Sequence, residues 1–204
     1  MIKNVIFDFG QVLVRFEPGY MVGVCVSDGD DKELLSRVIF DRLYWDELDA
    51  GALGHNEAFE LMRERLPERL HGVARRIYDD WILNIPEIEG MRELVTYIKE
   101  KYGVRCFVLS DISHYFAENS HKVPILSLID GCVFSATVGV TKPDRHIFEH
   151  LLAKFELDPT ETVFIDDKLG NIEGAATVGI KGYVFDGDSE KLREWLENEI
   201  NKSC

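Results

Sequence analysis

The sequence predicts an α/β fold in which a doubly wound parallel sheet carries a small helical cap, inserted after the first strand. Short apolar runs alternate with segments of helical period, which is the pattern of parallel strands connected by helices. Residues 17–86 interrupt this alternation with helical period alone. Because loops of that length are rare in compact domains, this interval is expected to fold as helices.

Five apolar runs bounded by polar residues are expected to be strands buried on both faces of the sheet. They are residues 5–9, 104–110, 132–134, 162–167 and 180–185. Between and after them, segments in which apolar residues recur every three or four positions predict helices. These are residues 88–103, 143–157, 171–180 and 189–200.

Within the insertion, helical period covers residues 31–43, 56–66 and 72–85, while YWDELDAG, beginning at Tyr44 and Trp45, is expected to be a turn. The predicted organisation is therefore a core of residues 1–16 and 87–204 and a helical cap of residues 17–86.

The chain is acidic, with 37 Asp and Glu against 23 Lys and Arg over 204 residues and a formal net charge of −14. A nucleic acid or an anionic membrane would be repelled, so neither is expected as a partner. A small anionic substrate would need a local cation. No apolar run approaches the length of a membrane span or a signal sequence.

The cysteines are widely spaced and include no C-x-x-C pair, which favours reduced thiols and a cytoplasmic protein. They are Cys25, Cys106, Cys132 and Cys204. The sequence leaves open whether the protein is a monomer or a homodimer.

Acidic and hydroxyl side chains stand at the ends of three predicted strands, where parallel sheets bind ligands. They are Asp8, Ser110, Asp111, Asp166 and Asp167. Singly, such residues are usually turn formers or helix caps. The adjacent carboxylates of Asp166 and Asp167 repel each other, however, and indicate a cation nearby. Oxygen ligands favour Mg²⁺, and Lys142 adds the positive charge that a phosphate group requires.

In order along the chain, FDFGQVL, VLSD, TKPD and FIDDKLGNIEGA resemble the four motifs of the haloacid dehalogenase superfamily. The resemblance is closest to the branch that contains glucose-1-phosphate phosphatases and the phosphatase domain of soluble epoxide hydrolases. It implies a Rossmann-like core with an inserted helical cap, and Mg²⁺-dependent hydrolysis of a phosphate monoester through an aspartyl phosphate.

The resemblance also implies roles for single residues. Asp8 is expected to be the nucleophile and a metal ligand, and Lys142 to neutralise charge at the nucleophile and at the bound phosphate. Ser110 and Asp111 are expected beside the phosphate, although Asp111 stands where this branch often has Asn. Further metal ligands are expected to be the Gly10 carbonyl and Asp167. Asp166 is expected either to contact the metal directly or to contact the residues that hold it.

Gly10 occupies the position at which most phosphatases of this superfamily have an Asp that protonates the leaving group. Such catalysis typically contributes about 10² to 10⁴ in rate. Either the leaving group is good, as in a sugar 1-phosphate, or water or a cap residue supplies the proton, the candidates being His55, Glu17 and His114. We expect a phosphatase that acts on a small phosphorylated metabolite, with a sugar phosphate as the first candidate substrate. The alternative is a catalytically weak module that binds a phosphorylated ligand or a protein.

Overall fold

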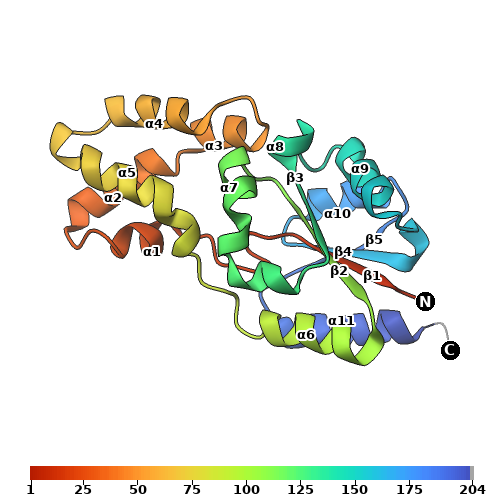
Figure 1. The fold of residues 1–204 in the computed structure, drawn as a ribbon. Helices are drawn as coiled ribbons and strands as arrows, with labels where there is room; N and C mark the ends of the chain where they lie inside the picture. Colours follow the sequence, from red (N-terminus) through yellow and green to blue (C-terminus); the bar gives the residue numbers. More distant parts are fainter. Residues whose placement is uncertain (203–204) are drawn as a thin grey trace.

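The computed structural model describes residues 1–202, which form a five-stranded parallel sheet with helices on both faces (Figure 1). The strands stand in the order β3-β2-β1-β4-β5. They are β1 (Asn4–Phe7), β2 (Arg105–Ser110), β3 (Gly131–Phe134), β4 (Thr162–Asp166) and β5 (Lys181–Val184). Each predicted run overlaps one of these strands, and the predicted fold class is confirmed.

The helices predicted from periodicity are present, with ends that differ by a few residues. They are α2 (Gly29–Ile39), α4 (His55–Glu64), α5 (His71–Asp80), α6 (Met91–Tyr102), α9 (Arg145–Phe155), α10 (Leu169–Ala176) and α11 (Ser189–Asn201). The sequence did not predict α1 (Pro18–Gly23), α3 (Arg42–Asp49), α7 (His114–Asn119) and α8 (Ser135–Val138).

The turn expected at Tyr44 and Trp45 is wrong, because both residues lie in α3. The Asp41 side chain caps this helix by accepting the backbone N–H of Leu43 at 3.0 Å. Such a cap satisfies one of the N–H groups that the first turn of a helix leaves without a partner.

Side chains of the central strands alternate between two apolar layers, as the period of a strand requires. Val5 and Phe7 belong to the layer covered by α6 and α11, whereas Ile6 faces α9 and α10 (Figure 1). All three side chains are fully buried. A sheet covered on both faces leaves its strand ends as the place where polar side chains can gather.

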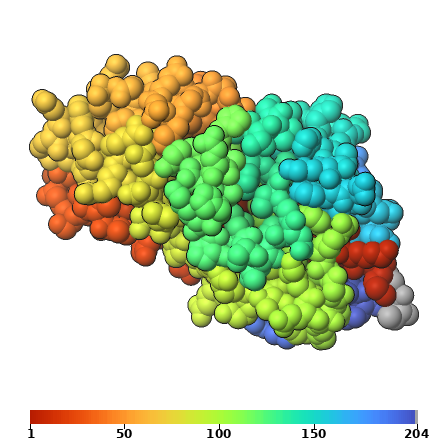
Figure 2. Space-filling view, viewed as in Figure 1, coloured from red at the N-terminus to blue at the C-terminus, as the bar shows by residue number. Residues whose placement is uncertain are grey.

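Helices α1 to α5 form the helical segment, residues 17–86, which lies beyond one end of the sheet (Figure 1) and makes up the left part of the molecule in the space-filling view (Figure 2). The division of the chain into a core and a cap stays a prediction. No helix within residues 1–202 has the length and apolar character needed to cross a membrane. Cys25, Cys106 and Cys132 are free thiols, and Cys204 lies outside the described residues.

Helix α10 packs against the segment that carries Lys142, and Gly174 makes this close approach possible. A Cβ atom at Gly174 would lie 2.4 Å from the Pro143 carbonyl oxygen. A Cβ atom at Gly170, near the start of the same helix, would meet nothing within 4 Å. The two glycines therefore form a matched pair for substitution.

Gly174→Ala should lower the free energy of unfolding by about 1–3 kcal/mol, because the added methyl group overpacks this contact. Gly170→Ala should raise it by up to about 1 kcal/mol, since alanine favours the helix over glycine. Urea unfolding followed by circular dichroism measures both values. Equal midpoints for the two variants would contradict the predicted packing.

Candidate active site

Three carboxylates meet at the carboxyl edge of the sheet. Phe7 and Ile165 are register partners in the paired strands β1 and β4, so the residues that follow, Asp8 and Asp166, lie side by side. Asp167 comes next, and one side-chain oxygen from each Asp lies within 4.8 Å of the others. The strand topology therefore gathers three of the four predicted acidic residues at one point.

Lys142 occupies the space between two of these carboxylates. Its Nζ atom lies 2.8 Å from Asp8 Oδ1 and donates to Asp166 Oδ2 at 2.8 Å and to the Leu109 carbonyl at 3.2 Å. Burial alone would lower the pKa of Lys142, but the carboxylates of Asp8, Asp166 and Asp111 outweigh it and raise that pKa. The ammonium is thus charged and fixed in place by its partners.

Asp166 and Asp167 have different surroundings. Asp166 is fully buried and accepts hydrogen bonds from the Lys168 N–H at 2.8 Å and from the Asn171 side chain at 3.0 and 2.9 Å, besides that from Lys142. Asp167 is only partly buried and lines the pocket described below. Asp167 is therefore the better placed of the two for direct contact with a ligand.

Ser110 and Asp111 stand at the end of the neighbouring strand β2. Ser110 is buried, with 3 % of its surface exposed, and lines the same pocket. Asp111 accepts the backbone N–H of Lys142 through Oδ1 at 2.9 Å, which ties the lysine segment to the end of β2. Burial raises the pKa of Asp111 above its ordinary value.

Asp8 carries a perturbed carboxyl group. Burial raises its pKa and the charge of Asp166 adds to this, while Lys142 and the Phe9 N–H, which donates to Asp8 Oδ1 at 2.7 Å, act in the opposite direction. The resulting pKa is about 6. One lysine thus leaves the negative charge of the cluster incompletely balanced, which fits an additional cation held by oxygen atoms.

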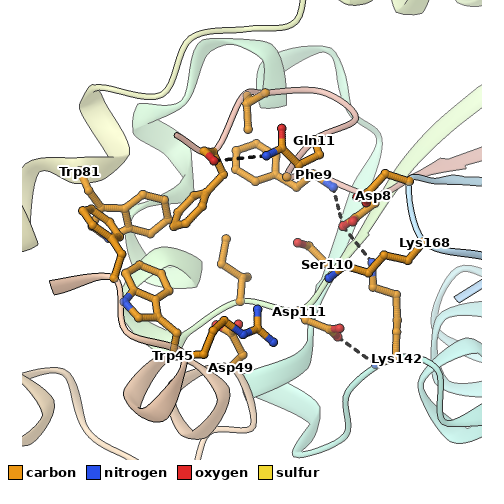
Figure 3. A pocket seen from close by; sticks show the side chains of 17 residues that line it. Asp8, Phe9, Gln11, Trp45, Asp49, Trp81, Ser110, Asp111, Lys142 and Lys168 are labelled. Carbon is orange, nitrogen blue, oxygen red and sulfur yellow. Dashed lines mark hydrogen bonds and ion pairs between the residues drawn. The ribbon is translucent and has the colours of Figure 1, made fainter. Parts of the chain in front are cut away.

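A pocket of about 290 Å³ opens in front of this cluster (Figure 3). The polar residues of its wall are Asp8, Gln11, Arg42, Asp49, Ser110, Asp111, Lys142, Asp167 and Lys168. The Gly10 position is open, since a Cβ atom there would meet nothing within 4 Å. Of the residues predicted to act as nucleophile, phosphate contacts or metal ligands, all except the fully buried Asp166 line this pocket.

The opposite part of the pocket is aromatic. Trp45 of α3 and Trp81 of the 3-10 turn Trp81–Leu83 approach each other with ring centroids 5.2 Å apart. Phe16 lies 5.4 Å from Trp45 and 5.6 Å from Trp81, and Phe40 stacks on Trp45 at 5.5 Å. This aromatic wall, defined by Phe16, Phe40, Trp45 and Trp81, comes largely from the helical segment. The pocket therefore pairs a charged end with an apolar end.

Asp49, the last residue of α3, lines the pocket and was not predicted from the sequence. Its Oδ1 atom is buried and has no hydrogen-bond partner among the described residues. Burial, aided by the charge of Asp111, raises the pKa of Asp49 to about 8. In the sequence, Asp49 is marked only by its place next to the apolar Leu48. Because a turn was expected there, Asp49 was not considered as a pocket residue.

The three proton donors proposed from the sequence lie elsewhere. Within residues 1–202, none of His55, Glu17 and His114 is among the residues that line this pocket. His55 is stacked between Tyr78 and Tyr115, with ring centroids 4.2 and 3.7 Å away, and its Nε2 lies 2.9 Å from Asp79 Oδ1. These contacts indicate a packing role for His55.

Comparison with known proteins places this geometry in context. A family model described as a haloacid dehalogenase-like hydrolase matches residues 2–179. The chain is 26% identical to the sesquiterpene phosphatase astK of Aspergillus oryzae over 88% of each protein. It is 23% identical to the D-ribitol-5-phosphate phosphatase of Bacteroides thetaiotaomicron, over 90% of this chain and 91% of that one.

Among solved structures, the HAD family enzyme bt-2542 of Bacteroides thetaiotaomicron, in complex with magnesium and inorganic phosphate, has the same fold. The TM-score is 0.67 at 19% identity, and the alignment covers 94% of this chain and 99% of that one.

Asp49→Asn should remove a pH-dependent cost of folding. In the unfolded chain this carboxyl ionises near pH 4, whereas in the fold its pKa is about 8. Between these two pH values, unfolding of the wild type releases a proton from Asp49. The free energy of unfolding of the wild type, relative to that of the variant, therefore falls as the pH rises, by at most about 1.4 kcal/mol per pH unit. Above about pH 8 the difference becomes constant.

Urea unfolding at a series of pH values measures this difference. Glu47→Gln is the matched control, because Glu47 lies on the same helix and is exposed. Parallel stability curves for the wild type and Asp49→Asn would show that Asp49 ionises normally in the fold.

Proposed function

The chain belongs to the haloacid dehalogenase-like hydrolase family, and from this premise we propose that it is a Mg²⁺-dependent phosphatase for a small phosphorylated metabolite. The observation that supports this most strongly is the buried Asp8–Lys142–Asp166 cluster, which stands at the charged end of the pocket. Such a cluster offers a nucleophile, a fixed positive charge and additional oxygen ligands within one site.

The donor set fits a magnesium ion. Carboxylate oxygens of Asp8 and Asp167, with the Gly10 carbonyl, would hold it, and Asp166 would act from outside through Lys142 and Asn171. When bound, the ion neutralises charge between the carboxylate of Asp8 and the phosphate group.

The remaining chemistry belongs to the side chains. Asp8 attacks phosphorus, forming an aspartyl phosphate that water then hydrolyses. Lys142, held 2.8 Å from Asp8 Oδ1, faces the charge that develops on the phosphoryl oxygens. The Ser110 hydroxyl, at the end of β2, donates a hydrogen bond to a phosphoryl oxygen that does not react. Asp111 positions Lys142 by accepting its backbone N–H.

The alcohol part of the substrate is proposed to contact the aromatic wall. A pocket of about 290 Å³ suits a small metabolite such as a sugar phosphate. The relatives named above act on a sugar-alcohol phosphate and on sesquiterpene phosphates, and an aromatic surface can bind either the apolar face of a polyol or a hydrocarbon chain. A substrate panel must therefore include both classes.

Asp8→Asn should reduce the release of phosphate to the background rate for every ester in that panel, because the amide is not a nucleophile. For the wild type, EDTA should abolish activity and added Mg²⁺ should restore it. Phosphate release from sugar, polyol, isoprenoid and 4-nitrophenyl phosphates measures these effects.

Glu149→Gln is the control, since Glu149 lies on the exposed face of α9, paired with Arg145. Equal and negligible rates for the wild type and Asp8→Asn across the panel would favour the alternative, a module that binds a phosphorylated ligand without turning it over.

A further inference from the structure

The proposed reaction requires a proton donor for the leaving oxygen, and the charged end of the pocket lacks an evident one. Gly10 has no side chain to provide it. Lys142 holds its charge between two carboxylates, so loss of its proton would leave Asp8 and Asp166 buried without their counter-charge. The carboxyl group of Asp111 is occupied by the lysine segment, because its Oδ1 atom accepts the backbone N–H of Lys142 at 2.9 Å.

The helical segment places a different carboxyl group in the same pocket. Asp49 ends α3 and lines the pocket, and its Oδ1 atom is buried without a hydrogen-bond partner among the described residues. Burial of a polar atom without a partner costs free energy, and the cost is largest for a charged carboxylate, so these surroundings favour the neutral, protonated form of Asp49. Figure 3 shows Asp49 on the wall across the pocket from Asp8.

Contacts with the core fix the position of Asp49. The Ser135 hydroxyl donates to the Asp49 carbonyl, and the same hydroxyl accepts the Ile112 N–H at 2.9 Å. Ile112 follows Ser110 and Asp111 directly, so this bridge ties Asp49 to the loop proposed to hold the phosphate. Gly51 strengthens the contact, since a Cβ atom there would lie only 2.7 Å from the Ala136 carbonyl oxygen.

We propose that Asp49 is the general acid and base of this hydrolase, replacing the acid that Gly10 cannot supply; this inference rests on the proposed phosphatase function. In the first step an Asp8 oxygen bonds to phosphorus, the bond from phosphorus to the ester oxygen breaks, and the proton of Asp49 passes to that oxygen, releasing an alcohol. In the second step a water oxygen bonds to the phosphorus of phospho-Asp8, the bond from phosphorus to the Asp8 oxygen breaks, and a proton of that water passes to Asp49. Phosphate leaves, Asp8 is again a carboxylate, and Asp49 again carries its proton.

The location agrees with the geometry of the reaction. The attacking and leaving oxygens of a phosphoryl transfer lie roughly in line, so the acid must stand beyond the phosphate from the nucleophile. Asp49 lines the pocket from the helical segment while Asp8 lines it from the sheet, which is the relative placement that this reaction needs (Figure 3).

The charge state of Asp49 also suits an acid. Burial is the main cause that raises its pKa to about 8, and Asp111 and Asp46 add to it, whereas Arg42 and Lys168 oppose it. His114 is a further titratable group nearby, since its Nε2 atom would lie 3.1 Å from a Cβ atom at Gly51. A carboxyl group with a pKa near neutral pH can both give and take a proton during turnover.

The test compares phosphate esters whose leaving groups differ in pKa, from 4-nitrophenyl phosphate to simple alkyl phosphates, all with Mg²⁺. Asp49→Asn should lower kcat for alkyl phosphates by about 10²- to 10⁴-fold, because alkoxides leave poorly without a proton. For 4-nitrophenyl phosphate, whose leaving group needs no proton, the loss should be less than about tenfold. For the wild type, kcat for alkyl phosphates should fall as the pH rises past about 8, where Asp49 loses its proton. In Asp49→Asn this fall should be absent.

Two further variants complete the design. Glu149→Gln, on the exposed face of α9, should behave as the wild type toward every ester. Gly10→Asp in the Asp49→Asn background should restore part of the alkyl phosphate activity, since a Cβ atom at Gly10 meets nothing within 4 Å.

The outcomes separate the two proposals. If Asp49→Asn loses no activity, or loses the same factor with all esters, while Asp8→Asn remains inactive, the assignment of Asp49 is overturned and the phosphatase function stands. If the wild type releases no phosphate even from 4-nitrophenyl phosphate, both proposals fall.

Discussion

The buried ammonium of Lys142 between Asp8 and Asp166 is the interaction on which the rest of the site depends. Without it, two carboxylates at neighbouring strand ends would face each other in a largely water-free environment, at a cost of several kcal/mol per ion. The same lysine also joins the ends of β2 and β4, through the Leu109 carbonyl and the Asp111 side chain on one strand and the Asp166 carboxylate on the other. A charged pocket in a chain with a net charge of −14 is possible because this cation is placed by the fold and not left to solvent.

Much of this edge could be predicted from the sequence, because it follows from local patterns. The apolar run before Asp8 defines a buried strand, and a parallel sheet brings the ends of its strands to one edge, so Asp8, Ser110 and Asp166 were expected near one another. The fine distinction between Asp166 and Asp167 could not be predicted. It depends on the Asn171 side chain of α10, which donates hydrogen bonds to both carboxylate oxygens of Asp166. Asp167 instead lies at the pocket wall.

Most of the contribution of the helical segment was missed from the sequence, although Tyr44 and Trp45 were candidates for contact with substrate. Tyr44 and Trp45 were expected in a turn, but the Asp41 cap begins a helix there, and this helix carries both Trp45 and Asp49 into the pocket. The position of Asp49 depends on contacts distant in the chain, among them the hydrogen bond from the Ser135 hydroxyl to the Asp49 carbonyl oxygen, and no local pattern reports such contacts. In the sequence, Phe40 and Trp81 are only apolar positions within helical patterns. Their contact with Trp45 depends on how the helices pack, which the sequence pattern does not show. A sheet edge that supplies the charged groups is thereby combined with a helical segment that supplies the apolar wall and a neutral acid.

The participation of Asp8 as a covalent nucleophile is tested most directly by trapping its phosphorylated form. The wild-type protein is mixed with substrate and Mg²⁺, quenched in acid within the first turnover, digested and examined by mass spectrometry. The expected result is a peptide containing Asp8 that is heavier by one phosphoryl group, formed and lost at rates that match turnover. Rapid release of phosphate with no modified Asp8 peptide at any time, and with the Asp8→Asn variant still active, would contradict the mechanism.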